Sequence, residues 1–184
     1  MLTRNYDSVT VAIMTILPSY GYTPTEADWL GGKPGVVKDH SGVIRALSDF
    51  PRTSNSVFGY TSSSDNFSKL TTSSTPALLI GSNNAEESYN DYGLDIIEEL
   101  TAMGYRSASI AYTVDGCVYT TVKTFINNTG NDITVNELGI YQYYDNISNI
   151  LLYRKKLDKS VTLKANGGTA TFSLVIDIPY ANKP

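Results

Sequence analysis

The last third of the chain most constrains the fold. Between Ser107 and Ile178, runs of strand-forming residues alternate with polar or small residues, and turn signals separate the runs. Asp115-Gly116 and Asn166-Gly167-Gly168 are two such signals, since tight hairpins need residues that tolerate positive φ. The runs lie at 110–114, 117–126, 133–144, 150–157, 161–165 and 169–178. Short connections between successive strands predict a mainly β protein, an antiparallel β-sandwich of Ig-like or jelly-roll-like type.

The hairpin around Asp115-Gly116 contains the only cysteine. A two-residue loop would pair Val114 with Cys117 and Tyr112 with Tyr119. A single cysteine excludes an intrachain disulfide, so the fold does not depend on an oxidising compartment. Within an alternating strand, we interpret Cys117 as a buried small side chain in preference to a reactive thiol.

Two charges are expected to point inward from neighbouring strands. The apolar phase slips between Val135 and Leu138, which predicts a β-bulge at Asn136-Glu137 that re-aims Glu137. Arg154 lies on the strand that follows. One interpretation is a surface pair that contributes little to stability. The other is a partly buried bidentate pair that fixes strand register, because a guanidinium offers a planar fork to a carboxylate.

The first 35 residues are expected to form an arm and an aromatic loop. Residues 2–17 place apolar side chains at helical spacing, which favours an amphipathic helix over an alternating strand and ends it before Pro18. Residues 18–35 are rich in Gly and Pro and contain Trp29, which either closes one end of the core or contacts another subunit. The predicted organisation is therefore a helical or extended arm with an aromatic loop (1–35), followed by a β-sandwich domain (36–184).

The middle of the chain carries weaker signals. Short strands are expected at 36–37, 43–44, 57–60 and 77–80, and residues 61–75 form a polar loop that we expect to be mobile. In residues 85–104, Leu94, Ile97 and Leu100 are expected to line a short helix with acidic side chains facing water. Those acids are Glu86, Glu87, Asp91, Asp95, Glu98 and Glu99. They lack the alternating spacing of a calcium loop, so neither a metal nor a cofactor is predicted.

Composition narrows the functional classes. Charged residues make up 17% of the chain and the formal net charge is −4, which argues against nucleic-acid binding. The apolar run 9–17 is too short to cross a membrane and lacks the features of a signal peptide. His40, the only histidine, lies between Asp39 and Ser41 without a nucleophile-elbow pattern. Acids on a surface segment are poor glycosidase candidates, so no catalytic residues are assigned.

Several segments together resemble a known family. Phe125-Ile-Asn-Asn-Thr-Gly-Asn-Asp-Ile-Thr-Val-Asn-Glu-Leu-Gly-Ile-Tyr141 is followed by Leu151-Leu-Tyr-Arg154, Leu157-Asp158, Val161-Thr-Leu163 and Gly167-Gly168. This succession resembles a C-terminal module of tailed-bacteriophage virion proteins, with its "E-[IL]-G-[LI]-Y" strand, its "LL-x-R" strand and a final "V-T-[LV]…G-G" hairpin. The opening Leu2-Thr-Arg-Asn-Tyr6 is similar to the start of some of these proteins. The resemblance covers residues 107–178 and this opening, and the middle of the chain matches only loosely.

The resemblance implies a non-enzymatic virion structural protein, made in the bacterial cytoplasm and assembled in multiple copies in the tail, in the neck or on the capsid. Its expected partners are other copies of itself and other virion proteins, without nucleic acid, membrane or a small-molecule substrate. Candidate interface residues are Leu2, Tyr6, Val9, Ile13, Trp29, Tyr141, Tyr143 and Tyr144. The alternative is a module of a phage fibre that binds a glycan or protein on the host surface. That alternative would use an aromatic platform of Tyr141, Tyr143, Tyr144, Trp29, Tyr20 and Tyr22.

Overall fold

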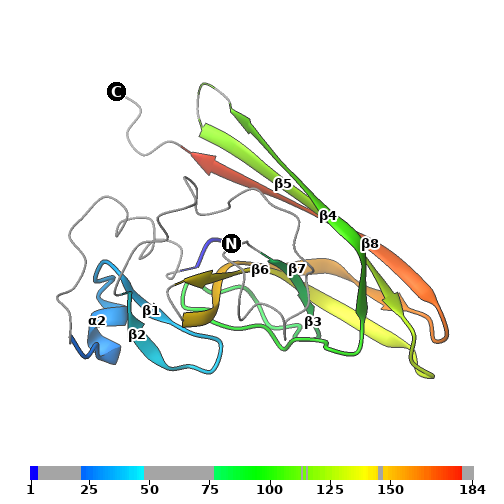
Figure 1. The fold of residues 1–184 in the computed structure, drawn as a ribbon, viewed down its shortest axis with the longest axis horizontal. Coiled ribbons are helices and arrows are strands. Elements are labelled where there is room, and N and C mark those ends of the chain that lie inside the picture. The colour runs from blue at the N-terminus through cyan, green and yellow to red at the C-terminus, as the bar shows by residue number, and fades with distance from the viewer. Residues whose placement is uncertain (4–21, 48–76, 113, 115, 145–146, 180–184) are drawn as a thin grey trace.

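The computed structural model describes residues 1–3, 22–47, 77–112, 114, 116–144 and 147–179. These residues form a mainly β protein with antiparallel sheets, which confirms the predicted fold class. The first sheet has the order β3-β6-β7, from β3 (Ala77–Gly81), β6 (Ile133–Tyr144) and β7 (Ile147–Leu163). The second sheet has the order β4-β5-β8, from β4 (Thr101–Tyr112), β5 (Gly116–Asn127) and β8 (Gly168–Pro179). The two sheets form separate layers, the second inclined to the first (Figure 1).

The main core lies between the two sheets. β6 and β5 are the central strands of their sheets, and their inward side chains meet those of the flanking strands. Phe125 and Phe172 pack edge to face with ring centroids 6.0 Å apart. Burying each large apolar side chain contributes about 1.5–3 kcal/mol. The core includes Leu78, Ile80, Tyr119, Phe125, Leu138, Ile140, Ile150, Leu152, Phe172, Leu174 and Ile176.

A second apolar cluster covers the other face of the first sheet. It consists of Ala77, Leu79, Leu94, Tyr141 and Leu151. Leu94 belongs to the segment 82–97, which connects β3 towards β4 and lies over this face. The first sheet is therefore buried on both faces, and this explains why residues 137–141 of β6 are all buried instead of alternating with exposed residues.

The hairpin between β4 and β5 differs from the prediction. Tyr112 pairs with Cys117 and Ile110 with Tyr119, so residues 113–116 separate the last pair and the two-residue loop is wrong. Four-residue hairpins also use glycine, because they are commonly built around a type I turn. The register is displaced by an even number of residues, so the side chains keep their faces. Cys117 is half-buried.

The predicted irregularity at Asn136-Glu137 is present, but its extra residues lie on the partner strand. Val135 pairs with Val161 and Glu137 pairs with Lys156, which spans two residues along β6 and five along β7. The runs predicted at 150–157 and 161–165 are therefore one strand of 17 residues with a bulge between its halves. Val135 and Leu138 both lie in the main core, as the phase slip required.

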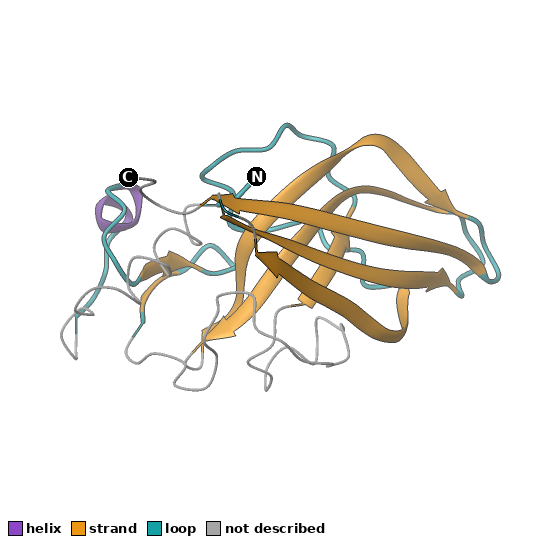
Figure 2. Cartoon of the chain, turned by 90° about the horizontal axis from the view of Figure 1, so that it is seen from above, coloured by secondary structure: helices purple, strands orange, loops and turns teal. Residues whose placement is uncertain are grey.

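The remaining described elements form a small unit at one end of the sandwich (Figure 2). α2 (Glu26–Leu30) begins at a capping box made by Thr25 and Asp28, and β1 (Val36–Lys38) pairs with β2 (Ile44–Ala46). Leu2 is extended and forms a bridge with Tyr153 of β7. The rest of the predicted N-terminal helix, the strand 57–60 and the polar loop 61–75 lie outside the described residues.

The helix predicted to carry Leu94, Ile97 and Leu100 is wrong. Ile96 forms an antiparallel bridge with Gly81, and β4 starts at Thr101. Leu94 packs in the second cluster, whereas Ile97 and Leu100 pack in the main core. The spacing of three arises because this extended segment passes around the edge of the first sheet from one face to the other.

Candidate functional site

The face of the first sheet that lies under segment 82–97 holds a buried ion pair. β6 and β7 bring Glu137 and Arg154 together, with Nε of Arg154 2.7 Å from Oε2 of Glu137. In the strand register Arg154 pairs with Gly139, so its side chain reaches Glu137 diagonally. The side chains of Glu137 and Arg154 are 0% and 3% exposed. The interpretation as a surface pair is therefore wrong.

Arg154 donates to Glu137 through Nε alone, so the predicted bidentate geometry is also wrong. Its Nη1 donates to the Glu86 carbonyl at 3.0 Å and to Oδ2 of Asp91 at 2.9 Å. Its Nη2 donates to the Ala85 carbonyl at 3.0 Å. Although burial alone would lower it, the hydrogen bonds to Asp91 and Glu137 raise the pKa of Arg154. Two nitrogens of the guanidinium therefore bind three acceptor atoms of segment 82–97, while Nε binds Glu137 on the sheet.

Glu137 extends the same network in the opposite direction. Its Oε1 accepts a hydrogen bond from the backbone N–H of Asp95 at 2.8 Å. The Asp95 carboxylate in turn accepts from Ser82 Oγ at 2.5 Å. We call the group Glu137, Arg154 and Asp91 the clamp, because these side chains bind both ends of segment 82–97. A buried pair of this kind has its charges satisfied by surrounding hydrogen bonds, and removing one partner is costly.

Two glycines make room for segment 82–97 on the sheet, one beside the clamp and one beside the second apolar cluster. A Cβ on Gly139 would lie 2.7 Å from Leu94 Cδ1 and 2.9 Å from Leu151 Cδ1. A Cβ on Gly81 would lie 2.7 Å from Glu137 Cγ and 2.8 Å from the Asp95 carbonyl oxygen. Separations below 3.0 Å are shorter than a real Cβ tolerates. A side chain at Gly139, the glycine of the Glu137–Tyr141 motif, would therefore displace Leu94 or Leu151 from its present packing.

Tyr141 ties a third segment to this face. Its ring is fully buried, and its hydroxyl accepts from the Leu94 N–H at 2.6 Å. Nδ1 of His40, in the loop after β1, lies 3.1 Å from the same hydroxyl. Burial raises the pKa of Tyr141 and lowers the pKa of His40. His40 thus contacts a buried tyrosine on the sheet.

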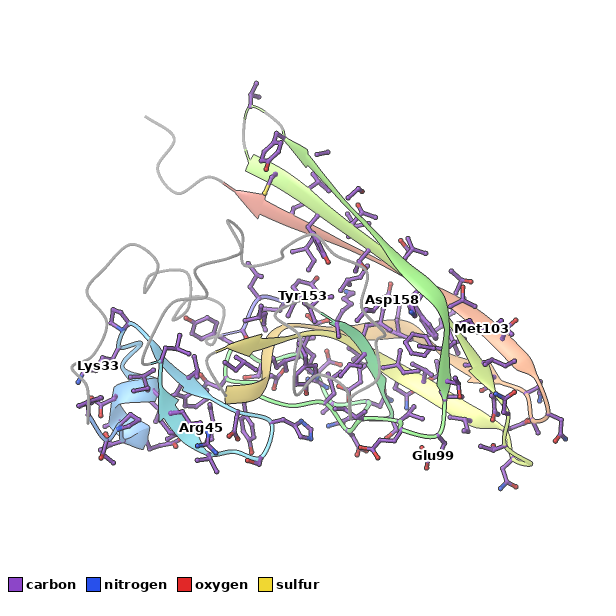
Figure 3. The ribbon with its side chains drawn as sticks, in the orientation of Figure 1. Lys33, Arg45, Glu99, Met103, Tyr153 and Asp158 are labelled. Atoms are coloured by element: carbon purple, nitrogen blue, oxygen red, sulfur yellow. The ribbon has the colours of Figure 1, made fainter. Side chains whose placement is uncertain are left out.

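The acidic residues of segment 82–97 contact cations of β7, and two of them also face water as predicted, since the Glu86 side chain is 86% exposed and Asp95 is exposed. Glu86 pairs with Lys156, and Glu87 lies 3.7 Å from Lys155 Nζ and accepts from the Lys156 N–H at 2.9 Å. Asp91 belongs to the clamp. Glu98 and Glu99 are exposed, as the sequence predicted, and Figure 3 shows Glu99 on the connection that leads into β4.

Two predicted interface residues are buried inside the chain. Trp29 is 2% exposed and packs edge to face against Tyr92 at 6.4 Å, with Lys38 Nζ 4.8 Å from its ring centroid. Tyr141 is 0% exposed. Neither offers its ring to a partner, because each fills an internal site, and their assignment as interface residues is corrected. Tyr6, Val9 and Ile13, and the side chains of Tyr143 and Tyr144, lie outside the described part of the chain.

Sequence reasoning singled out Glu137 and Arg154 but missed Asp91, Gly81, Gly139 and the role of Tyr141. The glycine and tyrosine of the motif were a usable signal. Glu137, Gly139 and Tyr141 occupy every second position of one strand and therefore share a face. Nothing in the sequence connects Asp91 to Arg154. Within the described ranges, no group of three or more His, Cys, Asp or Glu is placed to hold a metal ion. No helix among these residues is long and apolar enough to span a membrane.

Comparison of the chain with protein-family models, with curated proteins and with solved structures gave no match. The class of protein is therefore defined by the architecture itself, an antiparallel β-sandwich whose buried polar site joins two strands to a long connecting segment.

Proposed function

We propose that this chain is a non-enzymatic structural component of a tailed-bacteriophage virion, present in multiple copies in the tail, in the neck or on the capsid. The observation that carries the proposal is the clamp. The two strand motifs that resemble the phage module meet there, because Glu137 of β6 binds Arg154 of β7. Gly139 and Tyr141 of the same β6 motif lie against Leu94 of segment 82–97. Residues that carry the resemblance are thus residues that build the fold.

The chemistry of the clamp supports a mechanical role. A general acid or base must reach the proton that it transfers, directly or through one water molecule. Glu137 is 0% exposed, and both of its oxygens accept hydrogen bonds from the chain itself. Arg154 binds two carbonyls and two carboxylates. Such a network holds a surface segment rigidly against a sheet, which suits a subunit that must keep one shape among many copies.

The burial of Trp29 and Tyr141 weakens the alternative of a host-surface binding module. The aromatic platform on which that alternative rested loses two rings to internal packing. Binding of the purified chain to host cells or to a glycan array, at a level that cell-free controls do not show, would revive it.

The test of the proposed function is quantitative mass spectrometry of purified particles from the phage that encodes this sequence. An isotope-labelled standard of the tryptic peptide 107–123, which follows Arg106 and ends with Lys123, measures the copy number. We expect several copies per particle, at a ratio to the major capsid protein that stays constant through density-gradient and size-exclusion purification. Loss of the peptide during purification, or less than one copy per particle, contradicts the proposal.

A further inference from the structure

The two sheets differ in how their edges are protected. In the first sheet, the outer edge of β7 bonds to residues 1–3, with the Thr3 N–H donating to the Leu152 carbonyl at 3.0 Å. The outer edge of β3 bonds to segment 82–97, with the Ile97 N–H donating to the Ile80 carbonyl at 3.1 Å. In the second sheet, β4 and β8 each pair with β5 alone among the described strands. Exposed strand edges are templates for pairing with another chain.

β8 is the better template of the two open edges. Its register with β5 is unbroken from Gly168 to Pro179, whereas the register of β4 shifts between Met103 and Ser107. A regular strand of twelve residues directs about half of its N–H and C=O groups to its open side in a uniform ladder. Proteins usually protect such edges with charges, bulges or prolines. β8 has Asp177 as its one charge, and its one proline stands at its last residue.

The solvent-facing side chains of β8 also allow another strand to lie alongside it. Alternate residues of β8 lie in the main core, and the residues between them are exposed. Val175 is 53% exposed, which is high for a β-branched apolar side chain in a regular strand. The exposed set is Thr169, Thr171, Ser173, Val175 and Asp177. This row of hydroxyl and apolar side chains has one carboxylate and would tolerate a closely apposed strand.

We propose that β8 pairs in antiparallel fashion with β8 of a second copy of this chain, around a two-fold axis perpendicular to the second sheet. The pairing joins two three-stranded sheets into one six-stranded sheet. Its place in a particle rests on the proposed function, whereas the pairing itself does not. The alternative contact, β8 against β4 of a copy in the same orientation, gives a parallel ladder, because β4 and β8 run in the same direction on either side of β5. A parallel ladder is slightly less stable.

A two-fold contact requires that the strand be complementary to itself. Antiparallel neighbours on the same face stand opposite one another, so the axis passes midway between a residue near the middle of β8, Ser173 or Leu174, and the same residue of the second copy. Asp177 then stands opposite Thr169 or Thr171 of the second copy. No like charges meet, and the hydroxyl and valine side chains form cross-strand pairs of a favourable kind.

The test compares two charge variants of the full chain by sedimentation velocity. In one variant Ser173→Lys and Val175→Lys are combined, and in the other Ser173→Glu and Val175→Glu. The wild-type chain is expected to form a dimer of about 40 kDa, twice the 20.1 kDa of one chain. Each variant alone opposes like charges across the axis and should dimerise at least about tenfold more weakly. An equimolar mixture should recover the dimer, because Lys then meets Glu.

The matched control adds the same charges to the other open edge, with Ser109→Lys and Ala111→Lys on the exposed face of β4. This variant should dimerise like wild type, and circular dichroism checks that every variant is folded. A monomeric wild type at all concentrations up to the sub-millimolar range overturns the inference, as does equal dissociation by the β4 and β8 variants or failure of the mixture to recover the dimer. A chain that is monomeric alone but abundant in particles contradicts this inference only. A β8-linked dimer that is missing from particles contradicts the proposed function only.

Discussion

Glu137 joins two distant parts of the chain, since its carboxylate accepts hydrogen bonds from Arg154 on β7 and from the backbone of Asp95. Glu137→Ala leaves the buried guanidinium without this partner and the Asp95 N–H without its acceptor. We expect the free energy of unfolding in urea to fall by about 3–5 kcal/mol, the range for breaking a buried ion pair.

Lys164→Ala is the control for Glu137→Ala, because it removes an ion pair with Asp132 in which both side chains are exposed. Its melting temperature should match that of wild type. A loss below about 0.5 kcal/mol for Glu137→Ala would make its pair equivalent to a surface pair and contradict the role assigned to the clamp.

The Tyr141 hydroxyl is the acceptor for the Leu94 N–H, and Tyr141→Phe removes it while keeping the ring. A buried N–H without an acceptor costs about 1–3 kcal/mol, and the stability of the variant should fall by that amount. Hydrogen exchange should show faster exchange at the Leu94 amide. Tyr112→Phe is the control, since Tyr112 is 76% exposed. Unchanged protection of Leu94 in Tyr141→Phe would show that this hydrogen bond does not hold the segment.

His40 makes stability depend on pH in a defined direction. Burial lowers its pKa from the ordinary value of 6.5, so the unfolded chain takes up a proton at higher pH than the folded chain. The stability that neutral His40 contributes is complete above about pH 6.5, and it falls as the pH drops towards the lowered pKa of the folded state. His40→Gln should reduce the pH dependence of the free energy of unfolding between pH 7 and pH 5, measured by urea titration. An unchanged slope in the variant would assign that pH dependence to other groups.

Asp39 contributes in a lower pH window. Although burial alone would raise it, hydrogen bonds from Ser41 and Arg45 lower the pKa of Asp39. A carboxylate with a lowered folded pKa stabilises the protein above its unfolded value and loses that effect as pH falls further. Its contribution therefore disappears below about pH 4, which separates it from the effect of His40.

At the scale of elements, segment 82–97 is an extended connection that behaves as part of the first sheet. Gly81 stands where β3 meets this segment, and a Cβ there would press on Glu137 and on the Asp95 carbonyl. Gly81→Ala should therefore lower the free energy of unfolding by about 1–3 kcal/mol through overpacking. Gly130→Ala is the control, since nothing lies within 4 Å of an added Cβ. Equal stability of the two variants would contradict the close packing at Gly81.

The strands that were predicted most closely are those with one face in the main core. β5 and β8 begin and end within one residue of the runs expected at 117–126 and 169–178, because burial of one face produces regular alternation. β6 matches the run expected at 133–144, although residues 137–141 are buried on both faces of the sheet. The elements that were missed lack that simple environment. Leu94, Ile97 and Leu100 imitate a helix because their segment crosses a sheet edge. The two halves of β7 appear separate because a bulge interrupts the pattern.

The candidate site was predicted only in part. Glu137 and Arg154 lie on neighbouring strands, so a local argument could pair them. The other ligands of Arg154 come from Ala85, Glu86 and Asp91, more than sixty residues earlier in the chain. Such contacts are fixed by tertiary packing and leave no periodic signal. Trp29 and Tyr141 were candidate interface residues, and both instead fill internal sites.

At the scale of the whole molecule, the two sheets differ in how their faces are covered and how their edges are bonded. The first sheet is covered on both faces, and both of its edges bond to other segments of the chain. The second sheet has an open outer face and two edge strands that pair only with β5 among the described strands. We interpret the first sheet as the rigid body of the subunit and the second sheet as the side that meets neighbouring copies. The charge variants of β8 address the second half of this interpretation.

The proposed function makes the chain a repeated building block of a virion. A cryo-EM map of the intact, purified particle tests it most directly. We expect density for two inclined antiparallel sheets at symmetry-related positions, with Glu137 and Arg154 buried inside each copy and the second sheet facing a neighbouring subunit. A map in which every ordered subunit is assigned to other proteins, with no position that fits this sandwich, would contradict a role as a virion building block.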